Sequence, residues 1–449
     1  GACGVDGAAL GLAPAEAVAT DPQARLFLEV GAAALAAGEE GAARASAPAA
    51  STSIHRPSTA VFVGAMYHEY LDLLLQHSGG GAANTTAAAP PQAITGAGPS
   101  FLVGRAAFSL GLGGPAAATD TACSSSLVAV HFGASALRAR EASAALVGGV
   151  NLMLRPETTA AVCALGALSP AGRCRSLDAG ADGYGRAEGC AALMLRSVGG
   201  ASTAVPTGAL LLLATAVNHG GRAAGLTAPS GPAQTGLVRG ALERVGGGGA
   251  APPLTALALH ATGTPLGDPI EVGALGSALM RPAPLHLVAP KASLGHTEGS
   301  AGVAGLLVAL AMHARRAAPF QPHLHAVNPY VSGALDGWEG SAVAAVGRGC
   351  CATPLPLTGM TGTSAFGMSG VNAHALVGGQ RGPASLPPGL GLVWKRSRAV
   401  PFPLARAACL LAGASAGGGR LLFGSAGPDK APRLAAWAGC GAAATAAAV

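Results

Sequence analysis

One cysteine of the sequence has the surroundings of a nucleophile. Cys123 lies in the run DTACSSSL (120–127), in which small hydroxyl residues begin a helical pattern. A sulfur at a helix start lies near unpaired backbone N–H groups and the positive end of the helix dipole, and both lower the pKa of a thiol. A free cysteine also serves often as a small buried hydrophobe. The local pattern leaves both interpretations open.

Two histidines lie in loops of similar composition. His260 opens the run HATGTPLGD (260–268) directly after an apolar stretch, which places it at the carboxyl end of a predicted strand, where α/β proteins build their sites. His296 lies in KASLGHTEGSAG (291–302), five residues after Lys291. The alternatives are a capped turn around a satisfied histidine for the first loop and a solvated helix start for the second.

The stretch FGMSGVNAH (366–374) has the composition of a glycine-rich turn that can present backbone N–H groups. Together, one cysteine and two histidines in loops rich in Gly, Ser and Thr indicate a site at which a thiol is acylated. A zinc site is the competing interpretation, with Cys123, His260, His296 and His374 as ligands. The usual short ligand spacings of zinc sites are absent, so we expect no metal.

Short apolar runs and helix-length segments alternate between these motifs. The predicted strands cover residues 60–64, 144–149, 191–195, 210–217 and 254–259. The predicted helices cover residues 22–37, 124–139, 232–245, 269–279 and 300–314. This alternation indicates an α/β fold, and its restart near Ala209 suggests two similar halves. The pattern ends near Gly378, and residues 379–449 are predicted to form a linker and a low-complexity tail.

The composition narrows the class of protein. The 449 residues carry a formal net charge of +6 without a basic cluster and contain 4% aromatic residues, which argues against nucleic-acid binding. The nine cysteines form no CxxC pair, which favours a reduced intracellular chain over a disulfide framework. No apolar run reaches the length of a membrane-spanning helix. We therefore expect a globular chain with neither nucleic acid nor membrane as a partner.

In order and spacing, the four motifs resemble those of the β-ketoacyl synthases of type I polyketide synthases and animal-type fatty acid synthases. Connecting segments are similar to the same family, among them DPQARLFLEV (21–30), LVGGVNLMLRP (146–156), LSPAGRCRSLDAGADGYGRAEG (168–189) and LTAPSGPAQ (226–234). The resemblance covers roughly residues 5–378.

The resemblance implies a thiolase-like fold, with two duplicated βαβαβ-type halves in five αβαβα layers, and usually a homodimer. It assigns residues 1–208 to an N-terminal half with the nucleophile and residues 209–378 to a C-terminal half with both histidines. Family members begin with a strand and further residues before the stretch that matches 4–30. The resemblance therefore implies an N-terminally truncated chain that lacks the first strand, and we expect such a chain to be less stable on its own.

The implied activity is that of an acyltransferase, a β-ketoacyl synthase in polyketide biosynthesis that performs a decarboxylative Claisen condensation. Cys123 accepts an acyl group, and a malonyl-type extender then loses CO2 and attacks the resulting thioester. Both substrates arrive on the phosphopantetheine arm of an acyl carrier protein, and no cofactor is bound directly. The expected compartment is the cytoplasm, or a plastid if a leader precedes the sequence.

The resemblance also implies a role for each motif residue in the chemistry. Cys123 is the nucleophile. His260 and His296 donate hydrogen bonds to the thioester oxygen of the extender. Lys291 lies behind His296 and tunes its charge together with Glu298.

Other positions are implied to bind substrate or to support the catalytic groups. The backbone N–H groups of Cys123 and Met368 form the oxyanion hole, and the flexible Met368 also serves as a gate. Thr262 and Thr264 are implied to hydrogen-bond the phosphopantetheine arm. Phe366 and Asn372 are implied to support the site.

Three positions depart from the family pattern. Ala261 replaces the first glycine of the histidine loop and costs on the order of 1 kcal/mol if that position requires a positive φ. Ala258 stands where the family usually has Glu, and Ser293 where it usually has Asn. We expect these changes to reduce the rate without abolishing the chemistry.

Two alternatives remain open at this point. One is the condensing domain of a fatty acid synthase. The other is a non-catalytic ketosynthase-like module that docks carrier proteins or dimerises. Intact Cys123, His260, His296 and Lys291 argue against the second, because a decayed module is expected to lose its nucleophile first.

Overall fold

The computed structural model describes residues 11–45, 56–78, 91–197, 210–247, 251–279, 285–336, 353–354 and 359–379. Its larger strands form a four-stranded and a five-stranded sheet. Of the predicted tail over residues 379–449, residues 380–449 lie outside the described part of the chain.

The first sheet has the strand order β2-β1-β3-β4. Its strands are β1 (Thr59–Ala65), β2 (Ala116–Thr119), β3 (Ala144–Asn151) and β4 (Gly189–Arg196). β1 pairs in parallel with β2 and β3, whereas β4 is antiparallel to β3. Every residue of β1 and β3 is buried, which explains their nearly continuous runs of small apolar residues.

The second sheet has the order β5-β11-β10-β6-β7. Its strands are β5 (Leu210–His219), β6 (Leu254–Ala258), β7 (His286–Val288), β10 (Met360–Phe366) and β11 (Val371–Gly379). β6 is parallel to β7 and β10, and β11 runs antiparallel to both β10 and β5. A third, two-stranded sheet joins β8 (Ala317–Ala318) to β9 (Thr353–Pro354).

The larger helices are α2 (Pro22–Ala45), α5 (Pro99–Leu110), α6 (Ser125–Arg138), α8 (Gly231–Gly246), α9 (Gly267–Ala278) and α11 (Ala301–Arg315). The shorter ones are α1 (Pro14–Ala19), α3 (Tyr70–Ser78), α4 (Ala93–Gly96), α7 (Pro156–Ala164), α10 (Pro290–Leu294) and α12 (Pro329–Ala334). None of the helices in the described ranges is both long enough and apolar enough to cross a membrane.

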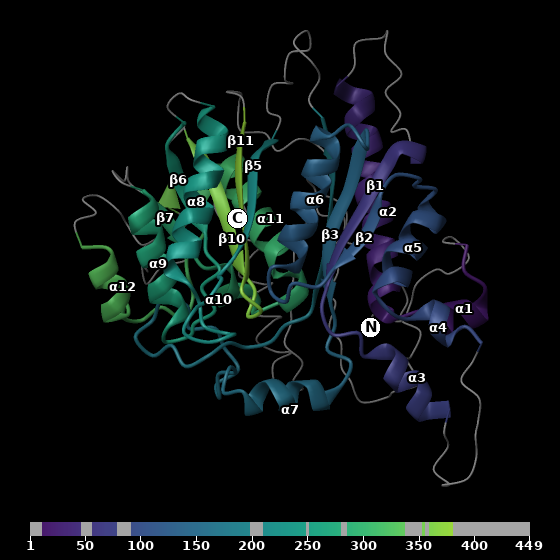
Figure 1. The fold of residues 1–449 in the computed structure, drawn as a ribbon, viewed down its shortest axis with the longest axis horizontal. Coiled ribbons are helices and arrows are strands. Elements are labelled where there is room, and N and C mark those ends of the chain that lie inside the picture. Colours follow the sequence, from purple (N-terminus) through teal and green to yellow (C-terminus); the bar gives the residue numbers. More distant parts are fainter. Residues whose placement is uncertain are drawn as a thin grey trace, which may run out of the picture.

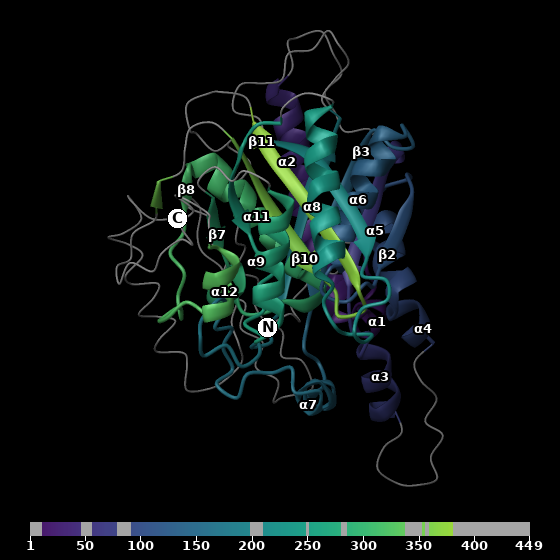
Figure 2. The same cartoon turned by 60° about the vertical axis from the view of Figure 1, so that its left-hand side comes forward.

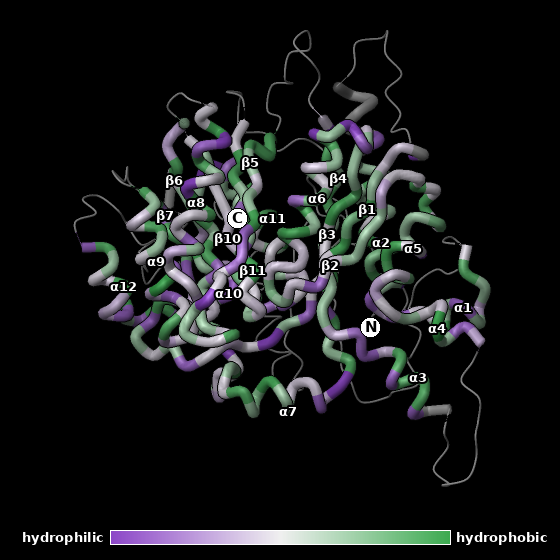
Figure 3. The backbone as a smooth tube through the Cα atoms, in the orientation of Figure 1, coloured by the Kyte–Doolittle hydropathy of each residue, from purple (hydrophilic) through white to green (hydrophobic). Residues whose placement is uncertain are grey.

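Helices and sheets alternate in five layers (Figure 1). α2 and α5 cover the outer face of the first sheet, and α8 and α9 cover the outer face of the second. α6 and α11 lie between the two sheets, as the turned view also shows (Figure 2), and supply most of the central core. Hydrophobic residues accordingly gather along the strands and along α6 and α11 (Figure 3). The predicted αβαβα layering is present.

The two large sheets are built on the same plan. In the first, β2 is followed by α6, β3 and β4, and in the second, β7 is followed by α11, β10 and β11. The strand orders β2-β1-β3-β4 and β7-β6-β10-β11 correspond position by position, including the antiparallel last strand. Among the described residues, β5 has no counterpart in the first sheet. The predicted duplication is therefore confirmed, and the boundary near Ala209 between the two halves stays a prediction.

All five predicted strands and all five predicted helices exist, most with ends shifted by one or two residues. The prediction for α2 ended too early, because the helix continues to Ala45. The sequence analysis did not identify β2, β7, β10 and β11 as strands. The stretch 366–374 was predicted to be a turn, but only residues 367–370 turn, while its ends belong to β10 and β11. β2 and β7 are short and β10 is rich in Gly, Ser and Thr, so their apolar signal is weak, while Asn372 and His374 interrupt the apolar run of β11.

Glycines allow the two central helices to approach each other closely. A Cβ on Gly302 of α11 would lie 2.6 Å from Cβ and 2.7 Å from the backbone nitrogen of Leu127 in α6. Real Cβ atoms do not come so close to a backbone atom, so a side chain at this position would force the helices apart. The contact between α6 and α11 therefore requires glycine here.

Replacing Gly302 by Ala should lower the free energy of unfolding by about 1–3 kcal/mol, because the added methyl group overpacks the interface between α6 and α11. Chemical denaturation measures the change. Gly236→Ala is the matched control, since Gly236 lies in α8 with no atom within 4 Å of an added Cβ. That control should stabilise the protein by about 0.5–1 kcal/mol. Equal effects of the two changes would contradict the close-packing argument.

Candidate active site

A strained turn between β2 and α6 presents Cys123. Ala122 has a φ of +55°, and its N–H donates to Oδ1 of Asp120 at 3.0 Å. The Oγ of Ser125 accepts the N–H of Thr121 at 2.9 Å and donates to the carbonyl of Ala122. These bonds hold Cys123 immediately before the first turn of α6, as predicted. The side chain is nevertheless only 6% exposed.

His296 is held on both sides by a neighbouring segment of the first half. Its N–H donates to the carbonyl of Gly185 at 2.7 Å, and its carbonyl accepts the N–H of Ala187 at 2.8 Å. The N–H of Glu298 donates to Nδ1 of His296 at 3.0 Å. Because Nδ1 accepts, the neutral imidazole carries its proton on Nε2.

The Nε2 of His296 lies 3.1 Å from the Sγ of Cys123. In the tautomer just derived, Nε2–H donates to the sulfur and cannot take a proton from it. A donor to sulfur stabilises the thiolate form. His296 therefore acts on Cys123 as a hydrogen-bond donor and not as a general base.

His260 is fixed in the same tautomer by different partners. Its Nδ1 accepts the N–H of Phe366 at 3.3 Å and lies 3.4 Å from Nζ of Lys291. The carboxylate of Glu271 accepts the N–H groups of His260 and Ala261 at 2.8 and 2.7 Å. The Nε2–H of His260 is thus available as a donor.

The two imidazoles lie close together in a buried site. Their ring centroids are 5.7 Å apart, and the ring planes are nearly perpendicular at 87°. Burial, followed by the nearby charge of Lys291, holds the pKa of both His260 and His296 well below the usual value. Both histidines are therefore neutral donors at neutral pH.

The acidity of Cys123 differs from the prediction. The helix start was expected to lower the thiol pKa, but burial and, after it, the carboxylate of Glu298 raise it to about 12. Lys291 and the backbone N–H groups of Met368 and Cys123 act in the opposite direction and only partly compensate. The prediction was wrong in sign because desolvation of a thiolate outweighs the dipole of one helix turn.

The predicted oxyanion donors both face the sulfur. The backbone N–H groups of Met368 and Cys123 each favour the thiolate of Cys123, which places them beside Sγ. Met368 lies in the turn between β10 and β11, where the N–H of Gly370 donates to the carbonyl of Gly367 at 2.9 Å. Its side chain is 37% exposed.

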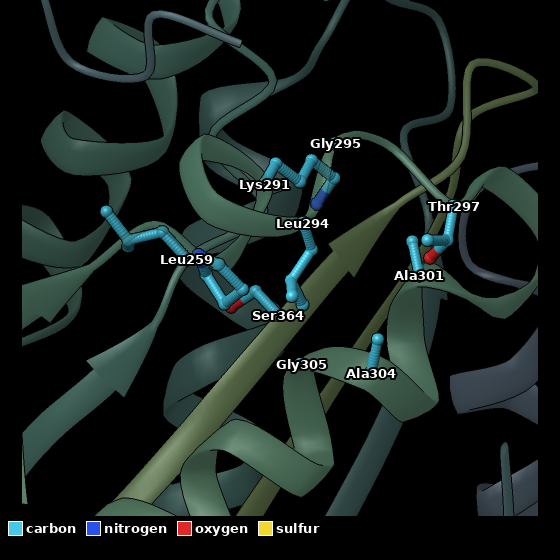
Figure 4. A pocket seen from close by; sticks show the side chains of 10 residues that line it. Leu259, Lys291, Leu294, Gly295, Thr297, Ala301, Ala304, Gly305 and Ser364 are labelled. Carbon is cyan, nitrogen blue, oxygen red and sulfur yellow. The ribbon is translucent and has the colours of Figure 1, made fainter. Parts of the chain in front are cut away.

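Lys291 occupies a different place from the predicted one. It was predicted to lie behind His296, but its ammonium contacts His260, where it approaches Nδ1 and donates to the backbone carbonyl. A cavity of about 10 Å³ lies beside Lys291, between α10, the start of α11 and Ser364 of β10 (Figure 4). This volume is near the minimum for one water molecule and too small for an acyl chain.

The remaining predicted residues divide into two groups. Phe366 is in the site, with its ring centroid 5.5 Å from that of His260. Thr262 and Thr264 lie at its edge, half-buried, with their hydroxyl oxygens 3.1 Å apart. Asn372 is not brought to the sulfur by any contact among the described residues, and its side chain donates to Asn218 at 3.1 Å.

The zinc interpretation receives no support from the placement of its four ligands. His374 is fully buried, and its Nδ1 lies 3.0 Å from the hydroxyl of Ser364. No three His, Cys, Asp or Glu side chains of the described ranges are placed to hold one metal ion.

The sequence analysis missed residues that line the site from the first half. The ring of Tyr184 packs edge-on against His296, with centroids 4.8 Å apart. Arg186 makes a buried ion pair with Glu298, and its guanidinium lies over the ring of Tyr67 at 5.1 Å. Tyr184 and Arg186 belong to the segment 168–189, whose resemblance to the family was noticed without a role for either residue. That resemblance was the signal that could have found them.

The three departures from the family pattern have different surroundings. Ala261 has a φ of +24°, so it occupies a backbone conformation that favours glycine. Ala258 is fully buried in β6. Ser293 is exposed at the surface of α10.

Two family models match consecutive parts of the chain. The model of the beta-ketoacyl synthase N-terminal domain matches residues 2–201, and that of the C-terminal domain matches residues 210–325. The chain is 39% identical over 378 residues to a phenolphthiocerol/phthiocerol polyketide synthase of Mycobacterium tuberculosis. It is 36% identical over 377 residues to erythronolide synthase EryA3 of Saccharopolyspora erythraea. These matches cover 82% and 83% of the chain, but only 16% and 11% of the respective relatives.

Solved ketosynthase structures are similar over the same region. The oxazolomycin ketosynthase domain of Streptomyces albus has a TM-score of 0.69 and 30% identity, and the match covers 85% of the chain and 64% of that structure. The ketosynthase from module 6 of the bacillaene synthase of Bacillus subtilis has a TM-score of 0.68 and 27% identity, with coverages of 85% and 62%.

Replacing Ala261 by Gly should stabilise the protein by about 1 kcal/mol, because it removes the strain of a positive φ. Thermal and denaturant unfolding measure the change. Ala160→Gly is the control, because Ala160 is exposed within α7 and its replacement should destabilise by about 1 kcal/mol. Destabilisation by Ala261→Gly of the same size as in the control would contradict the inferred strain.

Replacing His296 by Ala should slow alkylation of Cys123 by iodoacetamide at pH 8 about tenfold or more, because the thiolate loses a donor. Peptide mass spectrometry follows Cys123, and the exposed Cys163 serves as an internal control that should not change. An unchanged or faster reaction of Cys123 would show that Nε2–H does not stabilise the thiolate.

Proposed function

The chain belongs to the β-ketoacyl synthase family, and from that premise we propose that it condenses a Cys123-bound acyl group with a malonyl-type extender in polyketide assembly. Family membership confirms three predictions: the ketosynthase identity, the thiolase-like fold and the class of acyl-transferring enzymes. The chain spans less than a quarter of its curated relatives, so the pathway, substrates and partners of the whole protein remain part of the proposal.

In the acyl transfer, the thiolate of Cys123 attacks the carbonyl carbon of a carrier-bound thioester. The negative charge moves to the carbonyl oxygen, where the N–H groups of Cys123 and Met368 stabilise it. The tetrahedral intermediate then collapses and expels the carrier thiolate, which takes up the proton that the Cys123 thiol gave up, and the acyl group stays on Cys123. The position of both N–H groups beside Sγ supports this assignment.

Decarboxylation uses the two histidines as donors. The bond between the α-carbon and the carboxylate of the extender breaks, CO2 leaves, and the electron pair moves into an enolate oxygen. His260 and His296 donate Nε2–H to that oxygen, and their low pKa values keep them neutral for this task. The α-carbon then attacks the Cys123 thioester, a 3-ketoacyl chain forms on the carrier, and the Cys123 thiolate is released.

The single observation that carries this proposal is the arrangement around Sγ of Cys123. Nε2 of His296 lies 3.1 Å away, and the N–H of Met368 faces the same sulfur. A module that only docks carrier proteins has no need of this arrangement. The curated relatives described above are polyketide synthases, which favours this pathway over fatty acid synthesis.

The partners follow from the same chemistry. The hydroxyl groups of Thr262 and Thr264 are suited to hydrogen-bond the phosphopantetheine arm of an acyl carrier protein. β2 forms an outer edge of the first sheet, with partly exposed residues, and could pair with a second copy in a homodimer. We place the reaction in the cytoplasm, and this location stays a prediction.

Incubation with a short acyl thioester should add one acyl group to the protein and none to the Cys123→Ala variant, because the sulfur carries the adduct. Intact-protein mass spectrometry measures it. His260→Ala should still be acylated but should form 3-ketoacyl product at least about a hundredfold more slowly, since one enolate donor is lost.

Two outcomes would contradict the proposal. A folded parent chain that takes up no acyl group would favour the docking module. Equal loss of acylation and condensation in His260→Ala would refute the assignment of His260 to decarboxylation. Circular dichroism of each variant separates these results from a failure to fold.

A further inference from the structure

A buried ion pair lies behind the reacting groups. Nε and Nη2 of Arg186 each donate to one carboxylate oxygen of Glu298 at 2.8 Å. The two side chains are only 3% and 1% exposed. Asn151 also donates to Glu298 at 3.2 Å, and the remaining Nη1 of Arg186 donates to Thr159 at 2.6 Å. The pair is bidentate and supported by further hydrogen bonds.

The same two residues adjoin the groups that orient His296. The backbone N–H of Glu298 fixes the tautomer of His296, and Glu298 has a strained φ of +42°. The residues on either side of Arg186, Gly185 and Ala187, hold the backbone of His296. The ion pair therefore adds a side-chain link between two segments that are also joined at His296 by backbone hydrogen bonds and by the ring of Tyr184.

We propose that Arg186 is a positioning residue that neutralises Glu298 and thereby sets the acidity of the Cys123 thiol. This inference builds on the proposed function, which makes Cys123 the nucleophile. Arg186 acts through Glu298 and His296, and no contact places it against Cys123.

The charges around the sulfur explain the effect. Glu298 opposes the thiolate and Lys291 favours it. His296 donates to the sulfur. The phenols of Tyr67 and Tyr184 also lie near it, and both are neutral because burial raises their pKa values. With Arg186 in place, the ion pair offsets part of the carboxylate's charge. Without it, a buried carboxylate would stand uncompensated near the thiolate.

Two single substitutions should shift the acidity of Cys123 in opposite directions. Burial raises the pKa of Glu298 and Arg186 opposes that rise, so Arg186→Met raises it further; wherever the carboxylate is ionised, its charge is then unpaired and the thiol pKa rises. Glu298→Gln removes the negative charge and leaves a guanidinium, so the thiol pKa falls. At a fixed pH below the titration midpoint of the thiol, we expect alkylation to be about tenfold slower in Arg186→Met and about tenfold faster in Glu298→Gln. Each change corresponds to a shift of about one pH unit in the thiol pKa.

The experiment measures the rate of Cys123 carboxamidomethylation by iodoacetamide against pH, with peptide mass spectrometry as the readout. Cys163 is the internal control within each sample. Arg56→Met is the matched control variant, because Arg56 forms an exposed ion pair with Glu39 far along the chain from the site. Neither control should shift.

The double variant Arg186→Met/Glu298→Gln keeps the inference testable if a single variant fails to fold. It buries neither charge, so its alkylation midpoint should return close to that of the parent. Shifts of the same sign in both singles, no shift beyond the controls, or a displaced midpoint in the double variant would overturn the inference and leave a purely structural ion pair.

Alkylation needs neither an acyl substrate nor a carrier protein. A parent chain that is alkylated at Cys123 but never acylated would refute the proposed function alone. Opposite shifts in such a chain would still support the role of Arg186.

Discussion

The close contact between α6 and α11 is the constraint on which the site depends. Each half contributes one of these helices to the central layer, and Gly302 lets their backbones meet at Leu127. Cys123 lies just before the start of α6, and His296 lies shortly before the start of α11. Because both helices begin at the same place, their preceding loops are brought together. Cys123 and the histidine that contacts its sulfur thus come from different halves of a duplicated fold.

Burial then determines the chemical state of each group. The dry surroundings keep both imidazoles neutral and keep the thiol protonated more strongly than in water. Backbone N–H groups select the tautomers, so that Nε2–H of each histidine is a donor. Arg186 is held beside Glu298 as an ion pair. Burial lowers the pKa of Lys291, and the nearby Glu271 opposes that shift. The site consists of oriented donors around one sulfur.

The sequence was sufficient for the parts of the site that lie in continuous motifs. Cys123, His260 and His296 each stand at the end of a strand or the start of a helix, and such boundaries are visible in a one-dimensional pattern. The five predicted strands have continuous apolar runs, which are visible in the same one-dimensional pattern. The short or polar strands β2, β7, β10 and β11 were not, because pairing with neighbours and not hydrophobicity defines them.

What the sequence could not provide was tertiary context. The acidity of Cys123 was misjudged because helix polarity is local, whereas desolvation depends on the surrounding fold. Lys291 was assigned to the nearer histidine in sequence, but it contacts His260, which precedes it by 31 residues. The partnership of Arg186 with Glu298 spans 112 residues and has no signature in spacing. The duplication has a further consequence. A recombination joint between β4 and β5 would separate the half that holds Cys123 from the half that holds His260 and His296. Chimeric chains could then combine the first half of one relative with the second half of another, provided that the interface between α6 and α11 is compatible.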